Sequence, residues 1–245
     1  YPIFAQMARL RSVTVPLDRH GHHDLDAMAA AAARARVVVI CRPHNPTGTV
    51  ESAADLYRFL DRVPSGTVVL LDEAYVEFLA PELCLDIPSL VERYPNLVGV
   101  RTFSKAYGLA GLRIGYALAA PELAGLLWSM QLPFGISAGC TVAVAASYAA
   151  ESQLAQRIAH IVAERSYLNA RLRACGVYTT ESHANFVYLP ATHLPWAEIF
   201  TGRGLRVRAY PDGAVRITVG SRGSTRLVLA AVEAALSAPA GARRG

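Results

Sequence analysis

The chain has 245 residues, of which 53% are hydrophobic and 18% charged, and a formal net charge of +5. This length and composition predict a globular α/β protein with a substantial core. Its cationic residues are scattered rather than gathered in a basic run with interleaved aromatics, and its apolar stretches stop short of a membrane span, so neither nucleic-acid binding nor membrane insertion is expected.

The first residues, YPIFAQMARL, have a helical pattern that begins at Tyr1 without an initiating Met. We expect no signal peptide here. A polar loop follows and contains His20, His22 and His23. Three histidines suggest a metal site, but no second pair of ligands lies nearby in the sequence, so no metal centre is expected.

Three short apolar runs come next, at 34–43, 66–75 and 96–104. Each is followed by polar or small residues, which is typical of strands in a buried parallel sheet. Helical stretches at 50–63 and 86–94 separate them, so the three strands are expected to be parallel neighbours joined by crossover helices.

After Gly115 the pattern becomes mainly helical. Helices are predicted at 120–134, 137–150 and 152–176, then strands at 177–182, 184–190, 206–210 and 214–220, and a final helix from about Thr225 to Leu236. We expect a large domain over 1–150, a small α+β domain over 151–236 and a disordered tail over 237–245. The four cysteines lack disulfide or metal spacing and predict reduced thiols in the cytoplasm.

Lys105 is the sole lysine, because the other 23 of the 24 cationic residues are arginines. A buried lysine amine can lose its proton and attack a carbonyl carbon, whereas arginine stays protonated. Lys105 is therefore a candidate nucleophile. The alternative is a chance survivor on the surface of an arginine-biased sequence.

Other chemical groups end the same predicted strands as Lys105. If Lys105 forms a Schiff base with an aldehyde cofactor, Asp72 is suited to keep a pyridine nitrogen protonated. Tyr75 and Asn45 could donate to the phenolic oxygen of that ring. Ligands of open α/β sheets bind at the carboxyl ends of the strands, where these residues are predicted to lie.

Ser104 and Arg113 supply the hydroxyl and guanidinium donors that a cofactor phosphate requires. Each candidate also has an ordinary structural explanation when taken singly. Asp72 could cap a helix, Tyr75 could be a core residue, and Arg113 could pair with a surface carboxylate. Their joint occurrence around Lys105 favours a cofactor site.

The segments HNPTG, LLDEAYVEF, RTFSKAYGLAGLRIGYA, ANFVYLP and VRITVG, in this order and spacing, resemble fold-type I pyridoxal-phosphate aminotransferases. The resemblance extends to about residue 236 and is greatest to the histidinol-phosphate and aromatic amino-acid (phenylalanine) aminotransferases. It implies the aspartate aminotransferase-like α/β fold, with a mostly parallel sheet and a smaller C-terminal α+β domain.

For the cofactor, the resemblance implies that Lys105 bonds pyridoxal 5'-phosphate and moves a proton, while Asp72 binds the pyridine nitrogen. Asn45 and Tyr75 would contact the phenolic oxygen of the ring. The cofactor phosphate would lie against Ser104 and Arg113.

For the substrate, the resemblance implies contacts from Asn185 and Arg216, with Arg208 as a second anion-binding arginine. The reaction would move an amino group from an aromatic amino acid or histidinol phosphate to a keto acid such as 2-oxoglutarate. Members of this family are usually homodimers, so a homodimer is expected by analogy. The family's N-terminal arm and the stacking aromatic residue would precede Tyr1.

Three other functions remain open at this stage. A fold-type I decarboxylase or lyase would use the same residues for a different bond cleavage. A truncated, non-catalytic remnant is a second alternative, against which the intact Lys105 and Asp72 count. A hydrolase that uses Ser104 and Lys105 is the weakest, because adjacent residues of a strand point to opposite faces.

Overall fold

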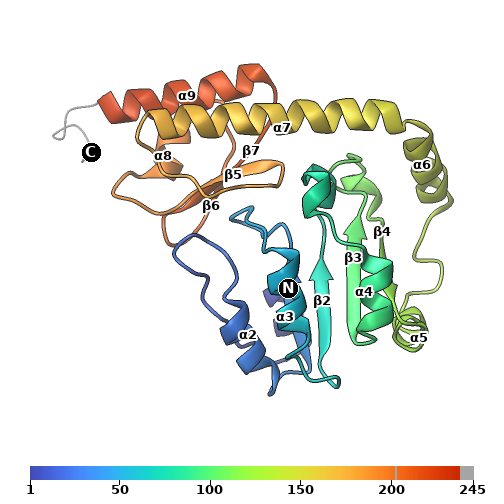
Figure 1. Cartoon of the computed structure of the whole chain (residues 1–245). Coiled ribbons are helices and arrows are strands. Elements are labelled where there is room, and N and C mark those ends of the chain that lie inside the picture. Colours follow the sequence, from blue (N-terminus) through green and yellow to red (C-terminus); the bar gives the residue numbers. More distant parts are fainter. Residues whose placement is uncertain (202, 238–245) are drawn as a thin grey trace.

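A computed structural model describes residues 1–201 and 203–237 of the chain, and its elements form two sheets with helices packed around them (Figure 1). The first sheet has the order β1-β2-β3-β4. Its strands are β1 (Val37–Cys41), β2 (Val68–Asp72), β3 (Leu97–Thr102) and β4 (Gly115–Ala119). The first three are parallel and β4 is antiparallel to β3.

Short helices accompany this sheet: α1 (Pro2–Met7), α2 (Leu25–Ala32), α3 (Ala53–Leu60) and α4 (Ile87–Arg93). Side chains that accept from backbone N–H groups define where three of them begin, namely Asp24, Ser52 and Asp86. The apolar faces of α2, α3 and α4 pack on the sheet in a core that includes Ile40, Leu71 and Leu97. This packing fixes the carboxyl ends of the parallel strands at one edge.

The second half of the chain is mostly helical and carries a small antiparallel sheet of order β5-β7-β6. Helices α5 (Pro121–Ser129), α6 (Ala138–Ala149) and the long α7 (Glu151–Ala174) lead into β5 (Phe186–Leu189), α8 (Trp196–Phe200), β6 (Arg208–Ala209), β7 (Val215–Thr218) and α9 (Arg222–Ser237). A second core joins α7, α8 and α9 to this sheet.

A third hydrophobic cluster connects the two halves. It contains Tyr75 and Phe78 from the segment after β2, together with Ala184 and Phe186 at the start of β5. Arg165 of α7 spans the same junction, because its Nη1 donates to the Phe78 carbonyl oxygen at 3.5 Å and to the Ala184 carbonyl oxygen at 2.8 Å. The small sheet is thereby held against the strand ends of the large one.

The structure confirms the predicted fold class and the three parallel strands. The predicted strand at 177–182 is wrong: this segment is irregular. Its Thr180 Oγ1 atom donates to the Thr47 carbonyl oxygen at 2.6 Å, and its Ser182 Oγ atom donates to the Phe186 carbonyl oxygen at 2.5 Å. The sequence also failed to predict α2, β4 and α8, and α9 begins at Arg222 rather than near Thr225.

The domain boundary near residue 150 stays a prediction. It coincides with the start of α7, whose C-terminal part contributes to the second core. Of the predicted tail at 237–245, Ser237 ends α9 and the remainder lies outside the described residues.

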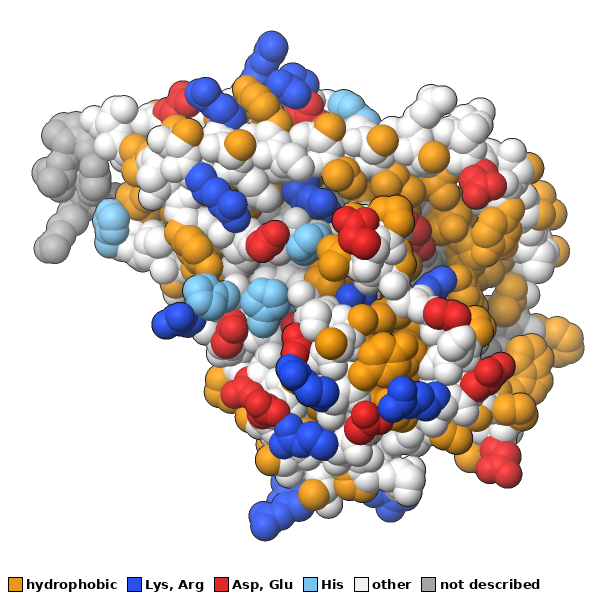
Figure 2. Space-filling model, in the orientation of Figure 1, with side chains coloured by type: hydrophobic (Ala, Val, Ile, Leu, Met, Phe, Trp, Pro, Cys, Tyr) orange, Lys and Arg blue, Asp and Glu red, His pale blue; other side chains and the backbone are white. Residues whose placement is uncertain are grey.

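Exposed hydrophobic side chains gather over α5, α6 and the segment between them (Figure 2). They include Trp128, Met130, Leu132 and Phe134, each more than two thirds exposed. Helices within the described part of the chain are all too short or too polar to cross a membrane.

Candidate active site

The ends of β2 and β3 bring Asp72 and Lys105 to the same edge of the large sheet. Asp72 is the last residue of β2, and Lys105 lies in a bend three residues after β3. The Lys105 Nζ atom lies 5.4 Å from the centre of the Tyr75 ring. The structure thus places three of the residues predicted from the sequence around one point.

The Asp72 carboxylate accepts two hydrogen bonds. Its Oδ1 atom accepts from the Ala74 N–H at 2.9 Å, and its Oδ2 atom accepts from the Tyr1 hydroxyl at 2.7 Å. Cys41 is the register partner of Asp72 on β1. Burial raises the pKa of the Cys41 thiol to about 12, and the Asp72 charge adds to this, so the thiol is neutral at physiological pH.

The electrostatics of the site favour a reactive lysine. Burial lowers the pKa of the Lys105 amine, and the positive charges of Arg216 and Arg113 lower it further, while Asp72 acts in the opposite direction. A lowered pKa increases the fraction of neutral amine, which is the nucleophilic form.

Tyr75 is buried between the two halves of the molecule. Its ring meets that of Phe186 edge to face, with centroids 5.1 Å apart. Burial raises the pKa of the Tyr75 hydroxyl to about 12, although the nearby Arg216 opposes the shift. Tyr75 is therefore a neutral hydrogen-bonding group at the site.

Arg216 reaches from the small sheet to the large one. Its Nη1 atom donates to Asn45 Oδ1 at 2.6 Å, and its guanidinium carbon lies 4.9 Å from the centre of the Phe186 ring. Its Nε atom is buried and has no hydrogen-bond partner within the described residues. An unpaired guanidinium N–H in such a place is suited to an anionic group of a ligand.

The other two predicted substrate residues occupy different places. Arg208 on β6 is exposed and lies directly opposite Arg216 on β7, so both side chains project from the same face of the small sheet. Asn185 directly precedes β5, and its backbone carbonyl oxygen accepts from the Val219 N–H at 2.9 Å.

Ser104 and Arg113 lie on the loop that follows β3. Ser104 Oγ accepts from the Thr102 hydroxyl at 2.9 Å. Arg113 is exposed, has a left-handed backbone with φ 54°, and donates to the Ala110 carbonyl oxygen at 2.8 Å. The positive charge of Arg113 contributes to the lowered pKa of Lys105.

Several residues of the site were missed by the sequence analysis. The contact of Tyr1 with Asp72 joins residues far apart in the chain, and no local pattern predicts it. Glu73 is fully buried and pairs with Arg101 at 2.8 Å, which ties the end of β2 to β3. The position of Glu73 directly after Asp72 in the sequence could have indicated that it belongs to the site.

The arrangement can bind an anionic carbonyl compound and attack it. Lys105 supplies the nucleophile, Asp72 a carboxylate, and Arg216 an anion-binding group. No group of three or more His, Cys, Asp or Glu side chains in residues 1–201 and 203–237 is placed to hold a metal ion.

Comparisons with known proteins agree with this chemistry. The chain is 46% identical over 226 residues to an aromatic amino acid aminotransferase of Streptomyces coelicolor, a match that covers 90% of this chain and 62% of that relative. The chain thus spans less than two thirds of the relative's length.

Solved structures share the fold. A histidinol-phosphate aminotransferase from Sinorhizobium meliloti, solved with pyridoxal-5'-phosphate, superposes with a TM-score of 0.86 at 30% identity, over 96% of this chain and 68% of that one. A decarboxylase from Sulfurospirillum multivorans gives a TM-score of 0.79 at 23% identity, over 93% of this chain and 63% of that one. This second likeness shows the fold alone.

The family model described as "Aminotransferase class I and II" matches residues 1–234, nearly all of the chain. Together with the convergence of a reactive lysine, a strand-end carboxylate and an anion-binding arginine, this match assigns the family: the chain belongs to the class I and II aminotransferases.

Proposed function

We propose that this chain carries the catalytic lysine and most of the cofactor site of a pyridoxal-phosphate aminotransferase that acts on aromatic amino acids. The observation that carries the proposal is the placement of Lys105 beside Asp72 and Tyr75, with Arg216 facing them from the small sheet. The 46% identity to an aromatic amino acid aminotransferase supports the substrate class.

The residues present fit the cofactor. One Asp72 oxygen accepts from the Ala74 backbone N–H, which fixes the carboxylate, while the other accepts from the Tyr1 hydroxyl. Asp72 would hold the ring nitrogen, and Tyr75 and Asn45 the phenolic oxygen. Ser104 and Arg113 would hold the phosphate. When bound, pyridoxal phosphate supplies an aldehyde for covalent attachment and a ring that accepts the electron pair released at the substrate carbon.

The chain's own residues perform the proton transfer and the orientation. The depressed pKa of Lys105 makes its amine available as a base, which would take the proton from the substrate carbon and return it at the cofactor. The substrate carboxylate would bind Arg216, whose guanidinium is held by Asn45 and lies over the Phe186 ring. Asn185 and Arg208 would complete the substrate pocket.

The amino donor is proposed to be an aromatic amino acid, with histidinol phosphate as the second candidate. The S. meliloti likeness supports the latter, because that protein is a histidinol-phosphate aminotransferase. The acceptor would be a keto acid such as 2-oxoglutarate. The higher identity to the S. coelicolor relative favours the aromatic donor.

We further propose a homodimer in the cytoplasm. The exposed apolar side chains over α5 and α6 support an association surface of this kind. Four free cysteines within the described residues are compatible with a reducing compartment. The division into domains at 1–150 and 151–236 belongs to the same proposal.

The proposal is tested by titration of the protein with pyridoxal phosphate while the visible absorption band of the bound cofactor is recorded. Borohydride reduction and peptide mass mapping then locate the attachment. We expect the mass increase on the peptide that contains Lys105. Lys105→Arg keeps the positive charge but removes the reactive amine, so it is expected to abolish both the band and the adduct.

The activity toward different amino donors is then compared, with protein that has been loaded with pyridoxal phosphate. Phenylalanine, tyrosine, tryptophan and histidinol phosphate are each incubated with 2-oxoglutarate, and glutamate formation is measured. We expect glutamate from the aromatic donors. Release of carbon dioxide without glutamate would identify a decarboxylase, and the absence of any adduct on Lys105 would leave a non-catalytic remnant.

A further inference from the structure

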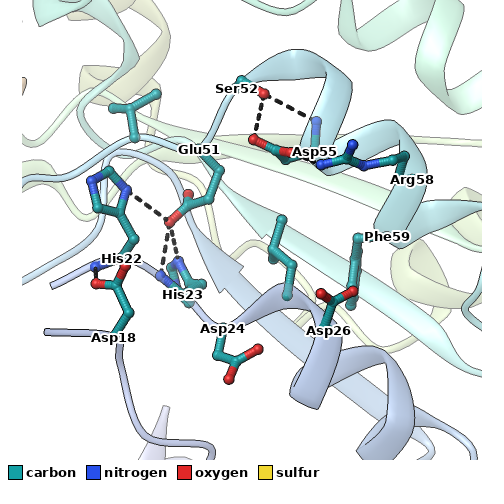
Figure 3. Close-up of a pocket in the computed structure, with 12 residues that line it drawn as sticks. Asp18, His22, His23, Asp24, Asp26, Glu51, Ser52, Asp55, Arg58 and Phe59 are labelled. Carbon is teal, nitrogen blue, oxygen red and sulfur yellow. Dashed lines mark hydrogen bonds and ion pairs between the residues drawn. The ribbon is translucent and has the colours of Figure 1, made fainter. Parts of the chain in front are cut away.

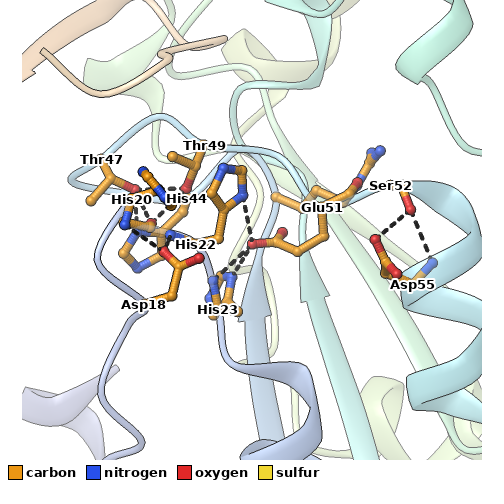
Figure 4. A network of polar contacts seen from close by, with 12 residues as sticks. Asp18, His20, His22, His23, His44, Thr47, Thr49, Glu51, Ser52 and Asp55 are labelled. Atoms are coloured by element: carbon orange, nitrogen blue, oxygen red, sulfur yellow. Dashed lines mark hydrogen bonds and ion pairs between the residues drawn. The ribbon is translucent and has the colours of Figure 1, made fainter.

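The turn at residues 43–49, which carries Asn45, is held by the loop that contains His20 and Gly21. The hydroxyls of Thr47 and Thr49 both donate to the Gly21 carbonyl oxygen, at 2.8 and 2.7 Å (Figure 4). Gly21 has φ +87°, and a Cβ atom there would lie 2.9 Å from Thr47 Cγ2. The loop and the turn are therefore in direct, tight contact.

A buried pair fixes the end of this loop to the end of the turn. Glu51 Oε1 accepts from the His23 N–H at 3.0 Å and lies 2.9 Å from His23 Nδ1, as Figure 3 shows. The His23 and Glu51 side chains are only 8% and 4% exposed. Although burial opposes it, hydrogen bonding from His23 holds the pKa of Glu51 below its usual range, so the ionised carboxylate accepts and His23 Nδ1 donates.

His23 also touches the residue next to Asn45. Its ring meets the His44 ring edge to face at 4.6 Å, and His44 Nδ1 lies 2.8 Å from Thr47 Oγ1. Burial lowers the pKa of His44 to about 4, and the neighbouring His23 lowers it further, so His44 is neutral at physiological pH. His23 therefore contacts the turn through His44 and the segment just after the turn through Glu51.

The opposite side of the turn is bound by the segment before β5. The His183 N–H donates to the Gly48 carbonyl oxygen at 2.7 Å, and Thr180 Oγ1 donates to the Thr47 carbonyl oxygen at 2.6 Å. With both sides held, Asn45 presents its Oδ1 atom to Arg216. Since the two ends of an amide point in different directions, the Asn45 Nδ2 atom is directed away from Arg216 and can donate elsewhere.

A hollow of about 440 Å³ lies on the outer side of His23 and Glu51 (Figure 3). Most of its carboxylate oxygens are engaged by the chain itself: Asp18 accepts from two backbone N–H groups, Asp24 caps α2, Asp26 pairs with Arg62, and Asp55 accepts from the Ser52 hydroxyl. These bonds hold the loop and the first turns of α2 and α3 in place. The exception among the carboxylate oxygens is Glu51 Oε2, which is buried without a hydrogen-bond partner in the described residues.

We infer that His23 is a positioning residue of the active site: paired with Glu51, it fixes the turn so that the Asn45 amide meets both Arg216 and the phenolic oxygen of the cofactor. This inference rests on the proposed function. His23 lies outside the cofactor and substrate contacts and acts on them through the turn.

The test compares His23→Leu, which removes the ring donor, with His23→Asn, whose amide nitrogen can replace Nδ1. His20→Leu is the matched control, since the His20 side chain bonds only to its neighbour Arg19 at the surface of the same loop. Each full-length variant is loaded with pyridoxal phosphate. The pH midpoint of the visible band, KM and kcat for phenylalanine, and the thermal unfolding temperature are then measured.

We expect His23→Leu to raise the pH midpoint by about 1 unit, because the phenolic oxygen loses a donor that stabilises its anionic form. KM is expected to rise several-fold as Arg216 loses its orientation. His23→Asn is expected to have a pH midpoint and a KM close to those of the wild type. His20→Leu is expected to match the wild type in both. A purely structural role would lower the unfolding temperature and leave the midpoint unmoved.

The outcomes separate this inference from the proposed function. If the wild type forms no band, both are overturned. If it does, and folded His23→Leu keeps the wild-type midpoint and KM, or His23→Asn is as impaired as His23→Leu, the positioning role alone is overturned. Should His23→Leu fail to fold, Glu51→Gln, which keeps the side-chain shape and removes the charge, is judged by the same midpoint and KM.

Discussion

The Tyr1 hydroxyl donates a hydrogen bond to Asp72 Oδ2 at 2.7 Å. Burial and this contact with Asp72 raise the pKa of the Tyr1 phenol, so it stays a donor at any physiological pH. A protonated pyridine nitrogen would need the same carboxylate. Tyr1 and the ring of the proposed cofactor are therefore expected to compete for Asp72. Helix α1, which follows Tyr1, has no buried residue.

This competition predicts that Tyr1→Phe binds pyridoxal phosphate more tightly. The substitution removes the hydroxyl and keeps the ring, so the cofactor no longer has to displace a hydrogen bond worth about 1 kcal/mol, and its Kd should fall about 3- to 10-fold. Titration of the visible band measures this Kd. An unchanged or weaker affinity in Tyr1→Phe would contradict the prediction; Tyr178→Phe, at another exposed tyrosine, is the control.

Asp72→Asn is expected to slow amino transfer by about 10²-fold or more, because a neutral amide does not keep the ring nitrogen protonated. The first half-reaction with phenylalanine, followed in a stopped-flow instrument, gives the rate. Asp86→Asn provides a control, since Asp86 caps α4 and asparagine is an equally good capping residue. A rate within a few-fold of the wild type would show that Asp72 does not contact the ring.

Arg216 and Arg208 are expected to differ in their effects although they face each other across β7 and β6. Arg216→Lys loses the planar donor set that bonds Asn45, and should raise KM for the amino donor about 10- to 100-fold with little change in cofactor attachment. Arg208→Ala, at an exposed position, should raise KM less. Steady-state kinetics measure the rise in KM for each variant. A rise in Arg208→Ala that equals or exceeds the rise in Arg216→Lys would make Arg208 the main anion-binding residue.

The sequence predicts the strand ends well because a buried parallel strand is a continuous apolar run whose end is marked by the first polar residue, as at Asp72. The register of Cys41 beside Asp72 then follows from the parallel pairing. By contrast, Gly115, Tyr116 and Ala117 at the start of β4 are all exposed, on both faces of the strand. Without an alternating pattern of burial, nothing in these residues distinguishes a strand from a loop.

The contacts that complete the site depend on the folded chain. His23 and Glu51 are 28 residues apart, so no local pattern distinguishes His23 from the other two loop histidines, although His23 alone forms a buried pair with Glu51 at 2.9 Å. The segment at 177–182 has the composition of a strand, but it is irregular, and the Thr180 hydroxyl donates to the Thr47 carbonyl oxygen in the turn at residues 43–49. Contacts of this kind join segments far apart in the sequence, and the residues of one segment alone do not predict them.

Glu77 gives a prediction about the pH dependence of stability. Its Oε2 atom is buried without a hydrogen-bond partner in the described part of the chain, and burial raises the pKa of this carboxyl from 4.5 to about 7. Glu73 adds to the shift, while the Glu77 backbone N–H and Arg101 oppose it. The folded state thus holds its proton more tightly than the unfolded state does.

Stability from this group is therefore fully present below pH 4.5 and is lost as the pH rises through about 7. Glu77→Gln, which stays neutral, should match the wild type at pH 5 within about 1 kcal/mol and exceed it by about 1–3 kcal/mol at pH 8. Urea unfolding at the two pH values measures the difference. The exposed Glu82→Gln should show no such dependence, and a Glu77→Gln protein that is no more stable than the wild type at pH 8 would contradict the buried, protonated state of Glu77.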